Sequence, residues 1–303
     1  MKKGAVLLIL AAGTLWGCIG IFVRYFNDLG LSSMQTAALR LMISAILFSV
    51  FVLIFDRKLF RIKPKDLWIF LGSGIVSVGI FTICYFQSIA LSSLSVASVL
   101  LYTAPVFVML FSLIFFKEKL NLNKIIALIF SVLGCAMTVG VIGGSLSVTL
   151  SGFLFGLGSG VCYALYSIFS RFALVCGYSP LTITLYTFIF AGVSVTAVCR
   201  PTEVVTVMTH SFTTVLLSLL FAVVSCVLPY LCYTLGLKYV RSSTASIIAT
   251  IEPVVATVMG AAVFHEAVVF PFGYIGIALV VSSVVLINLP IKSKNSDKTE
   301  KLT

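Results

Sequence analysis

The chain has 303 residues, of which 60% are hydrophobic and only 10% are charged, and its formal net charge is +11. This composition excludes an ordinary soluble domain, because apolar runs of about 18 residues or more recur along the whole chain. The positive charge does not indicate a nucleic-acid partner, since the basic residues flank the apolar runs, where they set orientation and meet anionic headgroups.

Ten apolar runs have about the length that crosses a bilayer, and the connections between them are short. We therefore expect an all-α integral membrane protein with ten transmembrane helices. The runs cover residues 4–23, 34–55, 67–87, 95–116, 125–142, 151–170, 180–199, 212–235, 243–264 and 269–289. The first run is long for the apolar region of a signal peptide and is followed by another span, so it is taken as the first helix.

The basic residues predict the orientation. Of the 20 Lys and Arg residues, seventeen fall on the side that holds both termini, Arg24 and Arg200 fall on the other side, and Arg40 lies within a span. Because cytoplasmic loops carry the excess of Lys and Arg, both termini are predicted to face the cytoplasm. The polar tail at residues 291–303 is predicted to be disordered.

The first helix begins a repeat that covers the chain. Residues 13–26 (GTLWGCIGIFVRYF) align with residues 160–173 (GVCYALYSIFSRFA) at a shift of 147, which pairs Trp16 with Tyr163. The predicted repeats are residues 1–145 and 149–290. Each holds five spans, an odd number, so the second repeat enters the membrane inverted relative to the first. An indole N–H inside a span needs a partner, and either a cavity or a backbone carbonyl could provide one.

The second, third and eighth helices add candidate residues. Arg40 lies about 9 Å from the outer edge at a rise of about 1.5 Å per residue, so it is either a structural arginine that reaches the interface or a residue of the pathway. The third helix carries Tyr85 and Gln87, and the eighth carries Tyr230 and Tyr233. These groups suit a cavity that holds organic solutes by stacking and hydrogen bonding, although ordinary aromatic packing is the alternative.

The repeat is clearest in the fourth and ninth helices. Residues 85–118 align with residues 233–266 at a constant shift of 148, without a gap. Each helix contains an internal proline, which frees the carbonyls of Leu101 and Ala249 and favours a break beside a wet cavity. A polar stripe precedes each proline. Its candidate pathway residues are Ser98, Tyr102 and Pro105 in one helix and Ser246, Thr250 and Pro253 in the other. Close helix approach is the alternative role for the small residues.

Glu252 is the only acidic residue inside a predicted span and lies about 13 Å from the inner edge. A carboxyl group at this depth must be paired, hydrated or protonated. Three roles remain open, namely a proton-binding site, a contact to a cationic part of a solute, and a static hydrogen bond. At helical spacing Glu252 does not share the polar stripe unless the break rotates it.

Glu118 and Glu266 end the fourth and ninth helices at opposite faces, as solvated helix-end residues or as alternating gate contacts. The eight cysteines form no C-x-x-C pair and have no nearby histidine, so no metal site, cofactor or redox pair is predicted. The absence of a G-x-x-x-x-G-K-[ST] motif argues against nucleotide hydrolysis.

These residues together resemble the drug/metabolite transporter superfamily, specifically its EamA-type exporters. The resemblance rests on the Trp-Gly pair in the first helix, the A-P-V and E-P-V stretches at 104–106 and 252–254, and the F-K-E and F-H-E ends at 116–118 and 264–266. It implies helices arranged around a central cavity that closes alternately at each face, and solutes such as amino acids that are exported. The bulky residues at 115–117 depart from the small linker common in the family.

The primary hypothesis is a secondary transporter that moves small organic metabolites out across a bacterial cytoplasmic membrane by alternating access. Its partners are the solute, the bilayer and, if Glu252 titrates, protons. A lipid-modifying membrane enzyme would need an acid, base or metal cluster at one depth, and the only histidines, His210 and His265, fall in outer loops. A sensor or assembly partner with the same fold is the third hypothesis.

Overall fold

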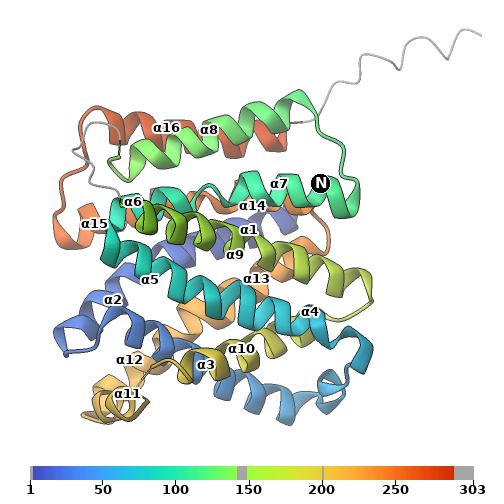
Figure 1. The fold of residues 1–303 in the computed structure, drawn as a ribbon, viewed down its shortest axis with the longest axis vertical. Helices are drawn as coiled ribbons and strands as arrows, with labels where there is room; N and C mark the ends of the chain where they lie inside the picture. Colours follow the sequence, from blue (N-terminus) through green and yellow to red (C-terminus); the bar gives the residue numbers. More distant parts are fainter. Residues whose placement is uncertain (1–2, 142–148, 200, 290–303) are drawn as a thin grey trace, which may run out of the picture.

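The structure is a computed structural model that describes residues 3–141, 149–199 and 201–289. Regular structure in these ranges is entirely helical (Figure 1). The predicted tail at 291–303 and Arg200 lie outside them. The all-α fold predicted from the apolar runs is therefore confirmed for the described part of the chain.

The first half of the chain runs from α1 to α8. Its elements are α1 (Lys3–Gly17), α2 (Ile19–Asp28), α3 (Ser33–Phe55), the 3-10 turns η1 (Arg57–Phe60) and η2 (Pro64–Asp66), α4 (Leu67–Leu71), the π-helical segment η3 (Gly72–Ile80), α5 (Phe81–Leu91), α6 (Leu94–Leu101), α7 (Ala104–Phe116) and α8 (Leu122–Thr138).

The second half runs from α9 to α16. Its elements are α9 (Leu150–Val175), α10 (Pro180–Thr196), α11 (Pro201–Met208), α12 (Phe212–Ala222), the π-helical segment η4 (Val223–Val227), α13 (Leu228–Leu237), α14 (Ser242–Ala249), α15 (Ile251–Phe264) and α16 (Phe272–Asn288).

Seven continuous helical stretches of the described chain are long and apolar enough to cross a membrane, or eight if the bent pair α10 and α11 forms one span. The helices α8 and α16 have 17 residues each. At a rise of 1.5 Å per residue, such a helix extends about 25 Å, which is less than a hydrocarbon core of about 30 Å. The count of ten spans therefore stays a prediction.

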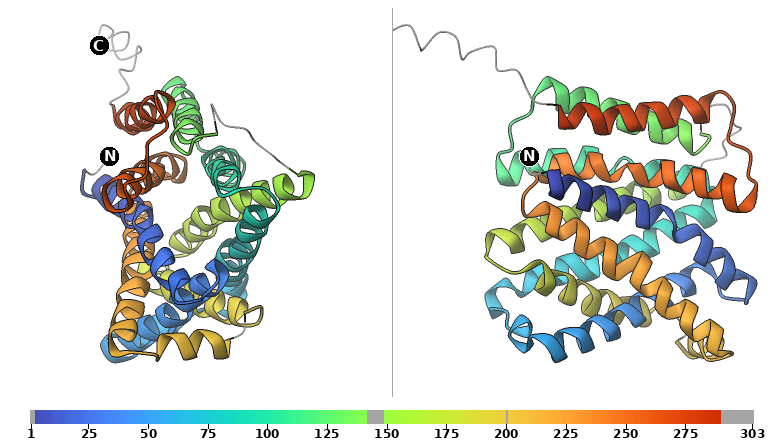
Figure 2. Two further views of the ribbon diagram at one scale, coloured as in Figure 1. Left: turned by 90° about the vertical axis from the view of Figure 1, so that its left-hand side faces the viewer. Right: turned by 180° about the vertical axis from the view of Figure 1, so that it is seen from behind.

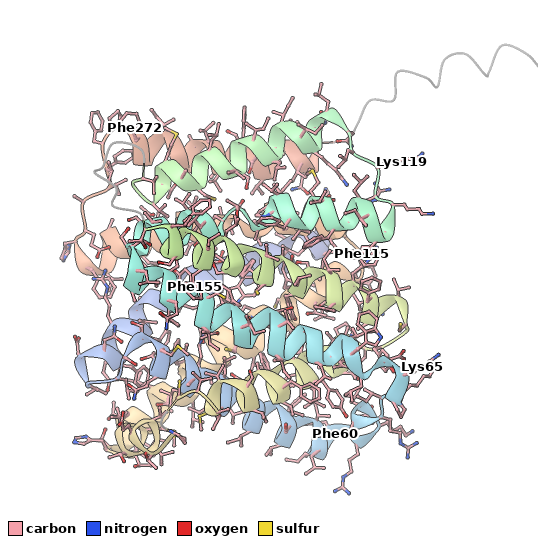
Figure 3. All side chains as sticks on the ribbon, viewed as in Figure 1. Phe60, Lys65, Phe115, Lys119, Phe155 and Phe272 are labelled. Atoms are coloured by element: carbon pink, nitrogen blue, oxygen red, sulfur yellow. The ribbon has the colours of Figure 1, made fainter. Side chains whose placement is uncertain are left out.

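The helices lie side by side, with α8 and α16 paired at one edge of the bundle and α3, α10 and α12 at the opposite edge (Figures 1 and 2). Lys65 and Lys119 lie at one end of the bundle and Phe272 at the other (Figure 3). The end that holds these lysines is called the basic end below.

The repeat predicted from the sequence extends to backbone details. The π-helical segments η3 and η4 fall at matching places. Ser77 and Ser225 are related by the shift of 148, and each hydroxyl donates to a carbonyl about one turn earlier, Ser77 to Gly72 within η3 and Ser225 to Phe221 just before η4. The caps of α7 and α15 also match, because Lys117 (φ 51°) and His265 (φ 55°) both adopt the left-handed conformation. Gapless alignment in the sequence thus corresponds to matching backbone geometry.

Both predicted breaks are present. The helix turns after Leu101, and α7 restarts with Pro105 in its first turn, while α14 ends at Ala249 and α15 restarts with Pro253 in its first turn. The freed carbonyls were expected at Leu101 and Ala249. The nearby hydroxyls instead bond one position or more earlier, since Thr103 donates to the Leu100 carbonyl and Thr250 donates to the Ile247 carbonyl, both at 2.6 Å.

The first helix of each half packs against the break of the other half. A Cβ atom added to Gly13 would lie 2.9 Å from the Ala249 oxygen, and one added to Gly160 would lie 2.7 Å from the Leu100 oxygen. One turn later, a Cβ on Gly17 would lie 2.7 Å from the Glu252 oxygen. Only glycine leaves room for backbones this close, so these residues fix the two halves together at their breaks.

The fourth span of each repeat, α6–α7 in the first half and α14–α15 in the second, runs in the opposite direction to the other. Glu118, just after α7, contacts Ser242 at the start of α14, whereas Tyr102 and Glu252 meet near the middle of both. An end-to-start contact together with a middle-to-middle contact requires antiparallel helices. This is the relation expected of an inverted repeat.

We predict that Gly17→Ala destabilises the protein by about 1–3 kcal/mol, because the new methyl group overlaps the Glu252 carbonyl and Val255. The measurement is the unfolding temperature of the purified protein in detergent. Gly20→Ala is the matched control, since nothing lies within 4 Å of its Cβ position and alanine favours the helix. Equal unfolding temperatures for the two variants would show that α1 does not approach the break closely.

Candidate functional site

An aromatic cluster lies where α1, α9 and α13 meet, at the junction of the two halves. Trp16 is 7% exposed, and its ring centroid lies 5.4 Å from that of Tyr230, 5.6 Å from Tyr233 and 6.1 Å from Tyr163. Tyr166 contacts both α13 tyrosines, at 4.9 and 6.1 Å. Of these residues, Trp16, Tyr163, Tyr230 and Tyr233 were predicted as pathway residues, and the structure brings all four together.

Hydroxyl pairs connect α9 to α13 within this cluster. Tyr166 shares a hydrogen bond with Thr234, and Ser167 shares one with Tyr233, both at 2.7 Å. The cluster surrounds a cavity of about 10 Å³, which has room for about one water molecule. The space that these aromatic side chains enclose is therefore too small for a metabolite.

Glu252 lies beside the cluster, in the first turn of α15. Its carboxylate accepts hydrogen bonds from Tyr163 at 3.2 Å and, at the longer distance of 3.5 Å, from Tyr102. The first of these tyrosines comes from α9 and the second from the break of the other half. A carboxylate at a helix N-terminus also interacts favourably with the helix dipole. Glu252 was not expected to share the polar stripe, and Tyr102 nevertheless reaches it from the opposite break.

Arg40 projects from α3 toward the same region and is half-buried. Its guanidinium lies within electrostatic range of Glu252, Tyr85 and Tyr230. Among the described residues it forms no ion pair and no side-chain hydrogen bond. A half-buried arginine and a half-buried glutamate thus lie within electrostatic range of one another, and neither forms an ion pair with a residue that the structure describes.

The remaining predicted residues are distributed along the pathway or outside it. Tyr85 and Ser98 share a hydrogen bond at 3.1 Å. Ser246 and Thr250 donate to carbonyls of their own helix, and Thr250 also accepts from the Ser131 hydroxyl of α8 at 3.1 Å. Pro105 and Pro253 are buried beside the breaks, whereas Gln87 is exposed and makes no hydrogen bond within the described residues.

Three residues of the cluster were not predicted, namely Ser77, Tyr166 and Ser167, which line the small cavity. Tyr166 lies three residues after Tyr163, so helical spacing could have placed both on one face. Ser77 and Ser225 match at the shift of 148, which was a second available signal. Ser167 had no distinguishing pattern. Within the described residues, no group of three or more His, Cys, Asp or Glu side chains could hold a metal ion.

At the basic end, Glu118 joins the two halves. Its carboxylate accepts from the Ser242 amide at 3.1 Å and from the Ser243 hydroxyl, and it pairs with Lys124 at 3.3 Å. Lys124 also donates to Ser243 at 2.8 Å. The side chain of Glu118 is only 7% exposed, so the interpretation of a solvated helix-end residue is wrong here. The end of α7 is held to the start of α14 by a buried ion pair.

At the opposite end, Glu266 pairs with Arg24 of α2, and the Arg24 guanidinium also lies 4.0 Å from the centre of the Phe264 ring. Both charged side chains are about half exposed. This contact connects the first span of one half to the ninth helix of the other. At each end of the bundle, a charged contact therefore joins the two halves.

Comparison with known proteins places this geometry in a family. The sequence profile of the EamA-like transporter family matches residues 3–140 and again residues 150–289. A protein of Archaeoglobus fulgidus named "uncharacterized transporter" is 32% identical over 184 residues, which are 61% of this chain and 62% of that protein. The first match thus spans under two thirds of the relative's length.

A second protein of the same organism and the same name is 26% identical over 292 residues, which cover 94% of this chain and 96% of the relative. One crystal structure superposes with a TM-score of 0.75 over 95% of this chain and 97% of its own, at 16% identity, and so supports the fold alone. These matches agree with the two-repeat helical architecture.

We predict that Tyr163→Phe and Glu252→Gln are coupled in a double-mutant cycle. Their hydrogen bond is charge-assisted, so the coupling free energy of unfolding is expected to be about 1.5–3 kcal/mol. Tyr166→Phe is the matched control, because its hydroxyl bonds Thr234 and not Glu252. Equal coupling free energies of Tyr163 and Tyr166 with Glu252 would contradict the hydrogen bond between Tyr163 and Glu252.

Proposed function

Because the chain belongs to the EamA-like transporter family, we propose that it is a secondary transporter that moves small organic solutes out across the bacterial cytoplasmic membrane by alternating access. Both termini face the cytoplasm, as the distribution of Lys and Arg predicts. The observation that carries the proposal is the junction of the two halves, where charged and aromatic side chains gather between two contacts that close the bundle ends.

The substrate class follows from the charges at this junction. Arg40 and Glu252 lie within electrostatic range of one another, and each lacks a counterion in direct contact among the described residues. A zwitterionic solute such as an amino acid satisfies both at once, with its carboxylate on Arg40 and its ammonium on Glu252. The rings of Trp16, Tyr230 and Tyr233 then contact its apolar part.

Coupling to protons uses the same carboxylate. Glu252 accepts from two tyrosine hydroxyls that bear no charge, and among the described residues no cation is in direct contact with it. A proton and a solute ammonium compete for this group. Such competition couples outward solute movement to inward proton movement, because release of one permits binding of the other.

The conformational change must open one end at a time. Glu118 and Lys124 close the basic end, and Arg24 and Glu266 close the other end. In this proposal, a state with both contacts formed is closed on both sides, and the small space of about 10 Å³ inside the aromatic cluster supports it. Opening either end separates a break from the first helix of the other half and enlarges the space around the cluster.

We predict that Arg40→Gln and Glu252→Gln each lower the affinity for a transported amino acid by at least about tenfold, since each removes a charge-assisted hydrogen bond. The measurement is counterflow in proteoliposomes with amino acids, their decarboxylated amines and their N-acetyl derivatives. Arg40→Gln should remove the advantage of the amino acid over its amine. Glu252→Gln should remove its advantage over the N-acetyl form.

Arg61→Gln and Asp28→Asn are the matched controls, because both residues are exposed and lie outside the cluster. Normal counterflow by both cluster variants would refute the site while leaving the transporter assignment intact. A wild-type protein without counterflow for any solute of the panel would count against the function itself.

We also predict that Glu118→Gln favours opening of the basic end. Breaking a buried ion pair costs about 3–5 kcal/mol, which is enough to shift the conformational equilibrium more than tenfold. The measurement is the rate of maleimide labelling at Ser246→Cys, a buried α14 position, in a background without the eight native cysteines. Labelling should accelerate with Glu118→Gln and not with Arg24→Gln. Acceleration by both variants alike would indicate general loosening instead of a gate.

A further inference from the structure

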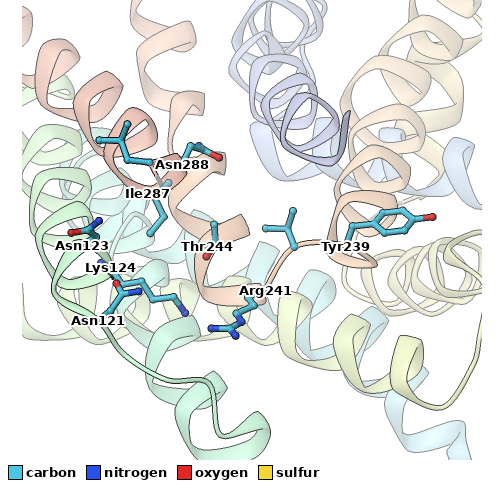
Figure 4. Close-up of a pocket in the computed structure, with 10 residues that line it drawn as sticks. Asn121, Asn123, Lys124, Tyr239, Arg241, Thr244, Ile287 and Asn288 are labelled. Atoms are coloured by element: carbon cyan, nitrogen blue, oxygen red, sulfur yellow. Dashed lines mark hydrogen bonds between the residues drawn. The ribbon is translucent and has the colours of Figure 1, made fainter. Parts of the chain in front are cut away.

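A second cavity, of about 470 Å³, lies at the basic end and shares no residue with the aromatic cluster. The first turn of α8, the link between α13 and α14, and the last turn of α16 surround it (Figure 4). Its lining residues are Asn121, Asn123, Lys124, Tyr239, Val240, Arg241, Thr244, Ile287, Asn288 and Leu289. Of these lining residues, the proposed transport cycle uses only Lys124, which pairs with Glu118.

Several polar groups of this cavity have no protein partner. Thr244 is only 5% exposed, yet its hydroxyl forms no hydrogen bond within the described residues. The same holds in those ranges for the side chains of Arg241 and Asn123. The other two amides are occupied, because Asn121 accepts from the Lys124 amide at 2.9 Å and Asn288 donates to the Val284 carbonyl at 2.7 Å. The donors of Thr244, Arg241 and Asn123 are therefore free to bind a ligand that enters the cavity.

The charged residues that line the cavity favour binding of an anion. Arg241 and Lys124 line the cavity, and no acidic residue does. Glu118 lies behind Lys124 and is neutralised by it, so the guanidinium of Arg241 supplies the unbalanced charge. The helices α8 and α14 both begin at the cavity and direct their positive dipole ends toward it. An arginine fork with a neighbouring hydroxyl matches the geometry of a phosphate group.

The rest of the lining is apolar. Val240, Ile287 and Leu289 form this part, and the adjacent Leu122 side chain is 70% exposed. The cavity therefore opens at the edge of the apolar surface, at the end of the bundle that carries the basic residues. Headgroups of anionic lipids lie at this depth, with their chains against the apolar helix surface.

We propose that this cavity binds a phosphate-bearing anion, with the phosphate on Arg241 and Thr244. The apolar wall favours a lipid headgroup as the source over a soluble phosphate. This site is separate from the proposed solute site, because it shares no residue with Arg40, Glu252 and the aromatic cluster, although Lys124 also belongs to the contact that closes the basic end.

The test uses the purified full-length protein in a neutral detergent. Dioleoylphosphatidylglycerol, dioleoylphosphatidylcholine and inorganic phosphate are titrated separately while the unfolding temperature is measured, since a ligand that binds the folded state raises it. Phosphatidylglycerol is expected to raise the unfolding temperature with a saturable midpoint, and phosphatidylcholine is not. The same dependence with inorganic phosphate would support the phosphate site and assign it to a soluble molecule.

Two variants and one control locate the site. Arg241→Gln should raise the midpoint about tenfold by loss of a charge-assisted hydrogen bond, and Thr244→Val should raise it about fivefold by loss of a neutral one. Lys119→Gln removes an exposed charge at the same end, outside the lining, and should leave the midpoint unchanged. Equal effects of Arg241→Gln and Lys119→Gln, or no saturable response to any of the probes, would overturn the proposal.

Discussion

The approach of each first helix to the break in the opposite half is the constraint on which the rest of the structure depends. The contacts of Gly13 and Gly17 with α14 and α15, and of Gly160 with α6, bring two interrupted helices together near the middle of the bundle. A side chain at any of these positions would separate the halves. The proximity of Tyr102, Tyr163 and Glu252 follows directly, because each is carried by a helix that this contact fixes.

Much of this could be predicted from the sequence, because it depends on periodicity and on residues with unusual backbones. The alignment at a shift of 148 and the two prolines predicted both the repeat and the breaks. The alignment did not predict which carbonyls the hydroxyl groups bind. Thr103 donates to the Leu100 carbonyl and Thr250 to the Ile247 carbonyl, whereas the freed carbonyls were expected one and two residues later. A hydroxyl rotamer depends on the local turn, and sequence spacing does not determine it.

The site was predictable where tryptophan or tyrosine recurred in both halves, and less so where contacts join distant segments. Tyr163 and Glu252 are 89 residues apart, and Lys124 and Ser243 are 119 apart. Glu118 and Glu266 occupy the same repeat position, yet their side chains are 7% and 51% exposed. Symmetry of the sequence therefore predicts equivalent backbones but not equivalent environments, because the partners come from segments that differ between the halves.

The π-helical segments η3 and η4 have a consequence for how the helices can move. A turn of this kind contains one residue more than an ordinary turn, so displacing it by a single position turns the intervening side chain by about 100°. The Ser77 hydroxyl donates to the Gly72 carbonyl within η3, and the Ser225 hydroxyl of η4 donates to the Phe221 carbonyl of α12. Each half thus contains a wide turn that can shift along its helix. Such a shift rotates part of the third helix relative to Tyr85, or part of the eighth helix relative to Tyr230, while the helix stays intact.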